Sequence, residues 1–323
     1  MRRTHHVALT LGALAIVTIR FAAAEPMLFS APVNLTEINT PFSDRNPTFS
    51  ADGLELLFIS DRPGSQDYDI WYASRTHAAL PFGTPVNVSE INSPGREATP
   101  CLSSDGLTLY FARGWTGHTQ SYDVYAAVRP DRSSAFSAPE LVAEVQSPMS
   151  DGGPFISADG LALYLVYDAD FPPPMEDLYV ATRSAPGDPF STPARIDELS
   201  TDNMERDPWV SADGLSMYFV SNRDGTHFGD YDIYLSERAS VGQPFGEAVK
   251  VFGVSSVEHD GSPFYDENTG SLYFHSNGFG GEGDVDIWVS RVVPEPSSVV
   301  LMLSGFGAVV ARRLRRRPKR GPH

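Results

Sequence analysis

The feature that most constrains the fold of this sequence is a unit of about 54 residues that occurs five times along the chain. In four units an Asp-Gly pair begins five residues after a proline, and in the fifth Glu267-Asn268-Thr269-Gly270 takes its place. Self-similarity at a fixed period of this length predicts a repeat architecture, in which each unit is one supersecondary element. The aligned prolines lie 53 to 55 residues apart and are Pro47, Pro100, Pro154, Pro208 and Pro263.

Each unit has the pattern of three strands joined by polar turns. Asp-Gly is typical of hairpin turns, and an alternating apolar segment follows it, as at residues 54–59 and 215–220. A third segment, such as Asp69-Ile70-Trp71-Tyr72, is rich in aromatic and β-branched residues and ends near an arginine. The repeat cores therefore lie near residues 44–75, 97–129, 151–183, 205–238 and 260–291.

A fourth, shorter strand is expected in the connectors, as at residues 85–88 and 248–251. The same element precedes the first unit at residues 29–35, and nothing like it follows the last unit. This offset is the pattern of a closed ring, in which the N-terminal strand completes the last blade and removes the free sheet edges. We therefore predict an all-β, five-bladed β-propeller of four-stranded blades over residues 25–292. The alternative, an open solenoid, would need capping repeats that the sequence does not contain.

The repeated motifs resemble those of the WD-repeat-like, TolB-type propeller family. The resemblance rests on Pro-x-x-Ser-x-Asp-Gly, as in residues 47–53, on Leu-Tyr-Phe, and on Asp-Ile-Tyr, as in residues 232–234. It spans about residues 29 to 292. The resemblance implies the fold but leaves the function open, because this family includes scaffolds, periplasmic adaptors and accessory domains of enzymes.

Residues 1–24 have the composition of a secretory signal peptide. Arg2 and Arg3 precede a mostly apolar stretch from Val7 to Ile19, and Ala22-Ala23-Ala24 supplies small residues for cleavage. The alternative is a buried N-terminal strand or helix. We predict that the mature protein is exported and begins near Glu25.

The C-terminal segment, residues 293–323, has three parts in a fixed order. Pro294-Glu295-Pro296 precedes an apolar segment at 299–311, and a tail with seven arginines and lysines follows. As a helix the apolar segment would span roughly 20 Å, short of the ~30 Å hydrocarbon layer, a mismatch that membrane thinning and snorkelling arginines can cover. The basic tail is expected to stay in the cytoplasm, which places the rest of the chain outside.

This arrangement resembles the PEP-CTERM sorting signal of Gram-negative bacteria. The resemblance implies recognition by an exosortase, a membrane protease-transpeptidase, with processing near Pro294, Glu295 and Pro296. It also implies an association with bacteria that make extracellular polysaccharide. We predict a protein anchored in the inner membrane and facing the periplasm, with release to the cell surface or extracellular matrix after processing. A plain tail anchor is the alternative.

The charge of the exported part argues against nucleic acid as a partner. Ten of the 24 basic residues lie in the two terminal segments, so 14 basic residues face 41 acidic ones and leave a net charge of −27. Such a surface repels nucleic acid and anionic lipid. The single cysteine, Cys101, excludes an intramolecular disulfide.

One acidic residue stands three positions before each aligned proline. Because the first strand of a propeller blade is the innermost, these carboxylates are expected at one mouth of the central channel, where they would bind a polar ligand or a Ca²⁺ ion. Arginines adjoin three of them and would neutralise them, and the alternative is that each carboxylate caps backbone donors of a neighbouring blade. The candidate residues are Asp44, Glu97, Asp151, Glu205 and Asp260.

No catalytic motif is recognisable. The histidines lack zinc spacing, and the five acids are related by the repeat, whereas glycoside hydrolysis needs two carboxyl groups in different environments. The irregular segment 168–176 is the loop that departs most from the repeat. We therefore predict a binding, scaffold or matrix-associated propeller without a resident cofactor, with a glycan or protein ligand. The alternative is a carbohydrate-active hydrolase or lyase that uses inward carboxylates.

Overall fold

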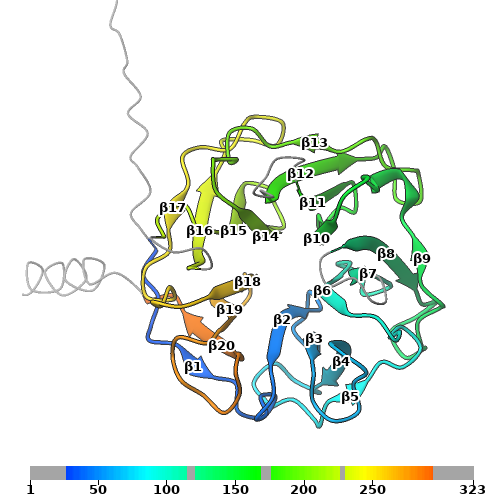
Figure 1. The fold of residues 1–323 in the computed structure, drawn as a ribbon, viewed down its shortest axis with the longest axis vertical. Helices are drawn as coiled ribbons and strands as arrows, with labels where there is room; N and C mark the ends of the chain where they lie inside the picture. The colour runs from blue at the N-terminus through cyan, green and yellow to red at the C-terminus, as the bar shows by residue number, and fades with distance from the viewer. Residues whose placement is uncertain (1–26, 115–120, 169–175, 226–229, 294–323) are drawn as a thin grey trace, which may run out of the picture.

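The chain forms a ring of five antiparallel sheets, each of four strands, around a central axis (Figure 1). The computed structural model describes residues 27–114, 121–168, 176–225 and 230–293. Among these residues the helical structure is one short 3-10 turn at Ala143–Val145. The all-β, five-bladed propeller of four-stranded blades is confirmed.

Each blade runs from an inner strand beside the axis to a two-residue strand at the rim. The inner strands are β2 (Asp44–Phe49), β6 (Glu97–Leu102), β10 (Asp151–Ile156), β14 (Glu205–Val210) and β18 (Asp260–Asp266). The second strands are β3 (Glu55–Ser60), β7 (Thr108–Gly114), β11 (Ala162–Asp168), β15 (Ser216–Ser221) and β19 (Ser271–Ser276). The third strands are β4 (Asp69–Ser74), β8 (Tyr122–Val128), β12 (Glu176–Thr182), β16 (Asp232–Glu237) and β20 (Asp286–Arg291). The outer strands are β5 (Val86–Asn87), β9 (Glu140–Leu141), β13 (Ala194–Arg195), β17 (Val249–Lys250) and β1 (Val33–Asn34).

The N-terminal strand closes the ring, as the offset of the repeats predicts. Strand β1 pairs with β20 in the last blade, with Val33 opposite Val289 (Figure 1). Backbone hydrogen bonds extend the contact on both sides, from Leu35 N–H to the Ile287 carbonyl at 3.0 Å and from Ser30 N–H to the Arg291 carbonyl at 2.8 Å. The last blade is therefore built from both ends of the propeller.

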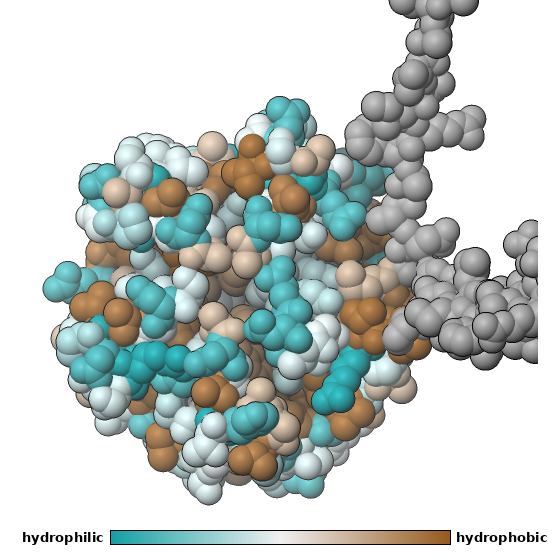
Figure 2. Space-filling model, turned by 180° about the vertical axis from the view of Figure 1, so that it is seen from behind, coloured by the Kyte–Doolittle hydropathy of each residue, from teal (hydrophilic) through white to brown (hydrophobic). Residues whose placement is uncertain are grey.

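Apolar side chains of the second strands hold neighbouring blades together. Phe58, Phe111, Phe219 and Phe274 occupy equivalent positions in four of these strands and are completely buried. One cluster of buried apolar residues contains both Phe58, in the blade of β2–β5, and Ile287, in the last blade. Full burial of such a side chain contributes about 1.5–3 kcal/mol. On the face opposite to that of Figure 1, hydrophobic and hydrophilic residues are interspersed (Figure 2).

The arginine after the third strand has the same contacts in four blades. Its guanidinium lies 4.2–4.6 Å from the ring of a phenylalanine in the connector. Its Nε–H donates to the carbonyl of the glycine in the Asp-Gly turn at 2.7 Å. The repeat of these residues is therefore explained by packing within each blade. The arginines are Arg75, Arg129, Arg183 and Arg238.

Two predicted segments lie outside the described residues, namely the signal peptide at 1–24 and the sorting segment with its apolar run at 299–311. Within the described part of the chain, no helix has the length and apolar character needed to cross a membrane.

Candidate functional site

The five repeated acids each begin an inner strand, and their side chains are completely buried. Each carboxylate accepts a hydrogen bond from a residue four positions earlier, in the loop that enters the strand. Thr40 N–H donates to Asp44 at 2.6 Å, Ser147 N–H to Asp151 at 2.8 Å, and Thr201 N–H to Glu205 at 3.0 Å. The Ser93 hydroxyl donates to Glu97 at 2.6 Å, and Ser256 N–H donates to Asp260 at 2.5 Å. Each carboxylate therefore caps a donor of the loop that precedes its own strand.

Three of the five acids are neutralised by arginines from the end of the second strand or the turn after it. Arg62 pairs with Asp44 at 2.5 Å, Arg113 with Glu97 at 2.9 Å, and Arg223 with Glu205 at 3.2 Å. These are not the arginines that adjoin the acids in the sequence. Neutralisation therefore occurs across the hairpin and not between sequence neighbours.

The other two acids, Asp151 and Asp260, form no ion pair with the described residues. Burial raises the pKa of each carboxyl from its ordinary value of 3.8 to about 6. One oxygen of each carboxylate, like Oε2 of Glu97, is buried and has no hydrogen-bond partner among the described residues. Among the described residues no group of three or more His, Cys, Asp or Glu side chains is placed to hold a metal ion. A ligand or a calcium ion on the five acids stays a prediction.

Residues that flank the acids line the channel, because side chains alternate along a strand. Arg45 and Arg206 follow their acids directly, and Arg96, Ser150 and His259 precede theirs; all five line one cavity at the mouth of the channel. None of the five acids lines this cavity. The cavity has a volume of about 250 Å³ and is formed by residues of all five blades.

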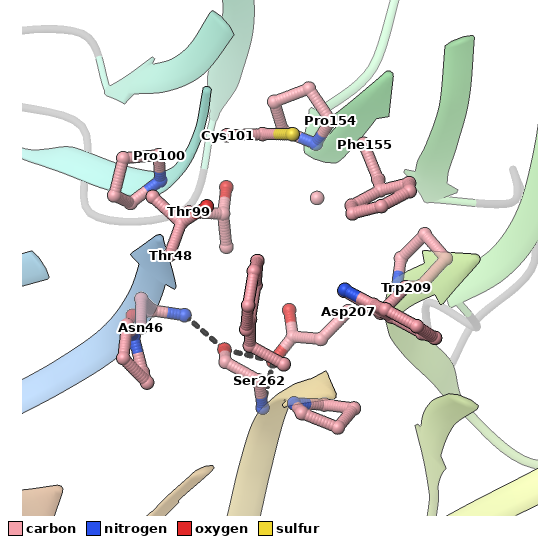
Figure 3. Close-up of a pocket in the computed structure, with 15 residues that line it drawn as sticks. Asn46, Thr48, Thr99, Pro100, Cys101, Pro154, Phe155, Asp207, Trp209 and Ser262 are labelled. Atoms are coloured by element: carbon pink, nitrogen blue, oxygen red, sulfur yellow. Dashed lines mark hydrogen bonds between the residues drawn. The ribbon is translucent and has the colours of Figure 1, made fainter. Parts of the chain in front are cut away.

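Below this mouth the channel narrows to a space of about 40 Å³ lined by the five aligned prolines (Figure 3). Every inner strand has a bulge here, and the residue before the proline has positive φ, from 45° to 54°. The Asn46 amide donates to the Ser262 hydroxyl, which donates to Asp207 at 2.7 Å. These residues lie on three different blades, so the hydrogen bonds link the blades around the axis.

Two carboxyl groups enter the mouth cavity from the third repeat. Asp168 and Glu176 face each other as a ladder pair between β11 and β12, and both line the cavity. Glu176 forms an ion pair with Arg206. Burial raises the pKa of Asp168, and the charge of Arg206 opposes this rise. The cavity therefore contains two acids in different environments.

The last blade contributes a pair of stacked imidazoles, His259 and His275, whose ring centres lie 5.3 Å apart. Asn46 N–H donates to His275 Nδ1 at 3.3 Å, which leaves the ring proton on Nε2. Burial lowers the pKa of His259 to about 4 and that of His275 well below its ordinary value. Both rings are therefore neutral at neutral pH.

A second wide cavity, of about 290 Å³, lies at the opposite end of the inner strands. Its wall includes the aromatic rings of Phe155, Trp209, Phe264 and Tyr265. Trp209 lies 6.0 Å from the ring of Phe155 and 5.9 Å from that of Tyr265, so these rings pack mainly on one another. The polar cavity at the other mouth offers more groups for recognition.

The sequence motif at the C-terminus matches a known family model. Residues 292–317 match the PEP-CTERM protein-sorting motif. The chain is a five-bladed β-propeller with a PEP-CTERM sorting motif. This motif indicates export, anchoring at the cell envelope and processing by an exosortase-type enzyme.

Solved structures share the propeller fold at low sequence identity. TolB from Acinetobacter baumannii matches with a TM-score of 0.52 and 14% identity over 79% of this chain and 56% of its own. A GH43_1 enzyme from Xanthomonas citri matches with a TM-score of 0.55 and 17% identity over 83% of this chain and 93% of its own. The catalytic domain of a GH62 α-L-arabinofuranosidase from Coprinopsis cinerea matches with a TM-score of 0.52 and 11% identity over 83% of this chain and 98% of its own. The search of curated proteins gives no match.

Proposed function

We propose that this protein is an envelope-displayed binding propeller that holds a glycan at the polar mouth of its channel. The observation that carries the proposal is the 250 Å³ cavity to which all five blades contribute charged or polar groups. A concave site with a few convergent polar groups is the usual form of a small-ligand site. Hydroxyl, amide, imidazole and carboxyl groups in one cavity suit a polyhydroxylated ligand.

The position of the sorting motif supports display outside the cytoplasm. The last strand ends at Arg291, directly before the matched segment, and Val293 N–H still donates to the Leu28 carbonyl at 2.8 Å. In this proposal the apolar segment 299–311 anchors the chain in the inner membrane, with the propeller in the periplasm. Exosortase processing then releases the propeller to the surface or matrix.

A cavity-blocking variant tests the binding site. A side chain added at Gly152 would meet no atom within 4 Å at its Cβ, and Gly152 lines the cavity. Gly152→Trp is therefore expected to fill the mouth while the melting temperature stays near that of the wild type. The matched control, Ala138→Trp, adds the same ring on an exposed connector.

The measurement is a glycan array with both variants and the wild-type propeller. We expect the wild type and Ala138→Trp to bind the same glycans and Gly152→Trp to bind none of them. Absence of any glycan binding by the wild type, or full binding by Gly152→Trp, would refute the proposal.

A second function, glycoside hydrolysis, is favoured by one observation. Asp168 and Glu176 line the cavity in different environments, since Glu176 is paired with Arg206 and the pKa of Asp168 is raised. Two carboxyl groups in different environments are the arrangement that glycosidases use. A GH43_1 enzyme and a GH62 α-L-arabinofuranosidase share this fold, which supports the hypothesis.

The hydrolase hypothesis predicts release of reducing sugar from a polysaccharide panel. Asp168→Asn and Glu176→Gln would each abolish this activity, whereas Asp197→Asn, an exposed carboxylate on the outer side of the third blade, would not. Turnover that is absent from the wild type, or unchanged in both cavity variants, would exclude this function.

A further inference from the structure

Two arginines of the mouth cavity, Arg45 and Arg96, form no ion pair within the described part of the chain. They belong to neighbouring blades, and both line the cavity. Their guanidinium carbons lie 4.8 Å and 4.0 Å from the centre of the Tyr68 ring, so they share one aromatic neighbour. Neither forms an ion pair with a carboxylate of the described residues, although the exported part of the chain is strongly acidic.

Arg45 has hydrogen-bonding capacity that the described residues do not use. One of its terminal nitrogens donates to the Tyr68 hydroxyl at 3.2 Å, but its Nε is buried without a partner. Burial lowers the pKa of Arg45 and the charge of Arg96 lowers it further, whereas Tyr68, Asp61 and Tyr122 act in the opposite direction. A guanidinium nevertheless stays charged in proteins, so two like charges face the same cavity.

The rest of the wall is not cationic. Glu176 compensates Arg206, and Asp168 lies on the same side as this pair. The two stacked histidines are neutral at neutral pH. The cavity therefore has a cationic wall from the two blades that carry Arg45 and Arg96. The other three blades contribute a wall of hydroxyl, imidazole and carboxyl groups.

We infer that the mouth cavity binds a sugar that bears a carboxylate, with this carboxylate held between Arg45 and Arg96. Guanidinium groups bind carboxylates through paired, charge-assisted hydrogen bonds, and a bound anion relieves the repulsion between two arginines. The sugar hydroxyls then face the Ser150 hydroxyl and the Asp168 carboxyl. The inference rests on the proposed glycan binding and specifies its ligand as an acidic glycan.

The test compares two probes that differ only at the carboxyl groups, tetragalacturonate and its methyl ester, by isothermal titration calorimetry. The ester keeps the sugar ring and its hydroxyls but removes the anion. We expect the ester to bind about tenfold to a hundredfold more weakly, the factor associated with a lost charged hydrogen bond. Binding of tetragalacturonate is expected to weaken with added salt.

Arg45→Gln and Arg96→Gln are each expected to weaken tetragalacturonate binding by a similar factor and to leave ester binding unchanged. The matched control is Arg195→Gln, which removes a half-exposed arginine on an outer strand. Because each cavity variant removes a like-charge contact, the melting temperature is expected to stay level or to rise. A loss of folding would instead indicate a structural role for the arginines.

Equal binding of the two probes, or binding by both cavity variants at wild-type strength, would overturn the inference. Glycan binding that Gly152→Trp abolishes but the arginine variants do not affect would leave the proposed function intact while refuting the acidic ligand. A short peptide that binds more tightly with a free C-terminal carboxylate than with an amide, through the same arginines, would assign the site to a peptide.

Discussion

Two acids at equivalent positions of neighbouring blades, Asp151 and Glu205, are expected to respond in opposite ways to neutralisation. Both are completely buried and begin an inner strand. Glu205 is paired with Arg223 and accepts from two hydroxyls, whereas one oxygen of Asp151 finds no partner in the part of the chain that the structure describes. Asp151→Asn should therefore stabilise the propeller at neutral pH, and Glu205→Gln should destabilise it.

The size of the first effect follows from the pKa of Asp151, which burial raises from 3.8 to about 6. Between these two values the folded state binds a proton that the unfolded state has released, so stability falls as the pH rises through this window. The loss is complete above about pH 6 and amounts to about 3 kcal/mol, at 1.36 kcal/mol for each pH unit. An asparagine resembles the protonated acid and avoids this loss.

The assay is thermal unfolding of both variants and the wild type at pH 4 and pH 7.5. At roughly 2 °C for each kcal/mol in a domain of this size, Asp151→Asn should melt about 6 °C above the wild type at pH 7.5 and close to it at pH 4. Glu205→Gln should melt lower at pH 7.5, because it leaves the Arg223 charge without its partner, at a cost of about 3 kcal/mol. If Asp151→Asn has the same effect at both pH values, or lowers the melting temperature at pH 7.5, the reasoning fails.

Three further changes test the ring closure, the channel and the sorting motif. Asn39→Ala should lower the free energy of unfolding in urea by about 2–3 kcal/mol, because the Asn39 side-chain amide hydrogen-bonds both the N–H and the carbonyl of Ile287, a buried residue of β20. An unchanged urea midpoint would contradict this role. Gly153→Ala should lower the free energy of unfolding by about 1–3 kcal/mol, because the new Cβ would lie 2.7 Å from Val166 and the residue has a φ of +54°. Gly152→Ala, whose Cβ meets no atom within 4 Å, should leave the stability unchanged. Three alanines at 294–296 should leave the full-length form uncleaved on an immunoblot, and normal processing would count against the motif.

The fold follows from the sequence because its main determinants are local and repeated five times. Asp-Gly turns set the first hairpin of four blades, and the unpaired element at residues 29–35 could be assigned to the last blade by counting strands. Each predicted core begins at the first residue of an inner strand and reaches the end of the third strand or just beyond it.

The candidate site was harder to predict, because it depends on the direction of single side chains. The five repeated acids stand out in the sequence, yet their carboxylates cap loops, and the residues beside them line the channel. Because side chains of successive strand residues point to opposite faces, applying this alternation to the inner strands would have assigned the acids and their sequence neighbours to different faces. Asp168 and Glu176 are the first and last residues of the irregular segment 168–176, but their pairing between β11 and β12 is visible only in the structure.

The pairing of β1 with β20 has a consequence for the order of assembly. The segment at 29–35 leaves the ribosome before its partner strand, yet its hydrogen bonds need residues some 250 positions later. Contacts of such sequence separation form late and slow the folding of a chain. The ring therefore cannot be completed until the whole repeat array has been synthesised, and a chain arrested part-way would expose an unpaired strand to proteases.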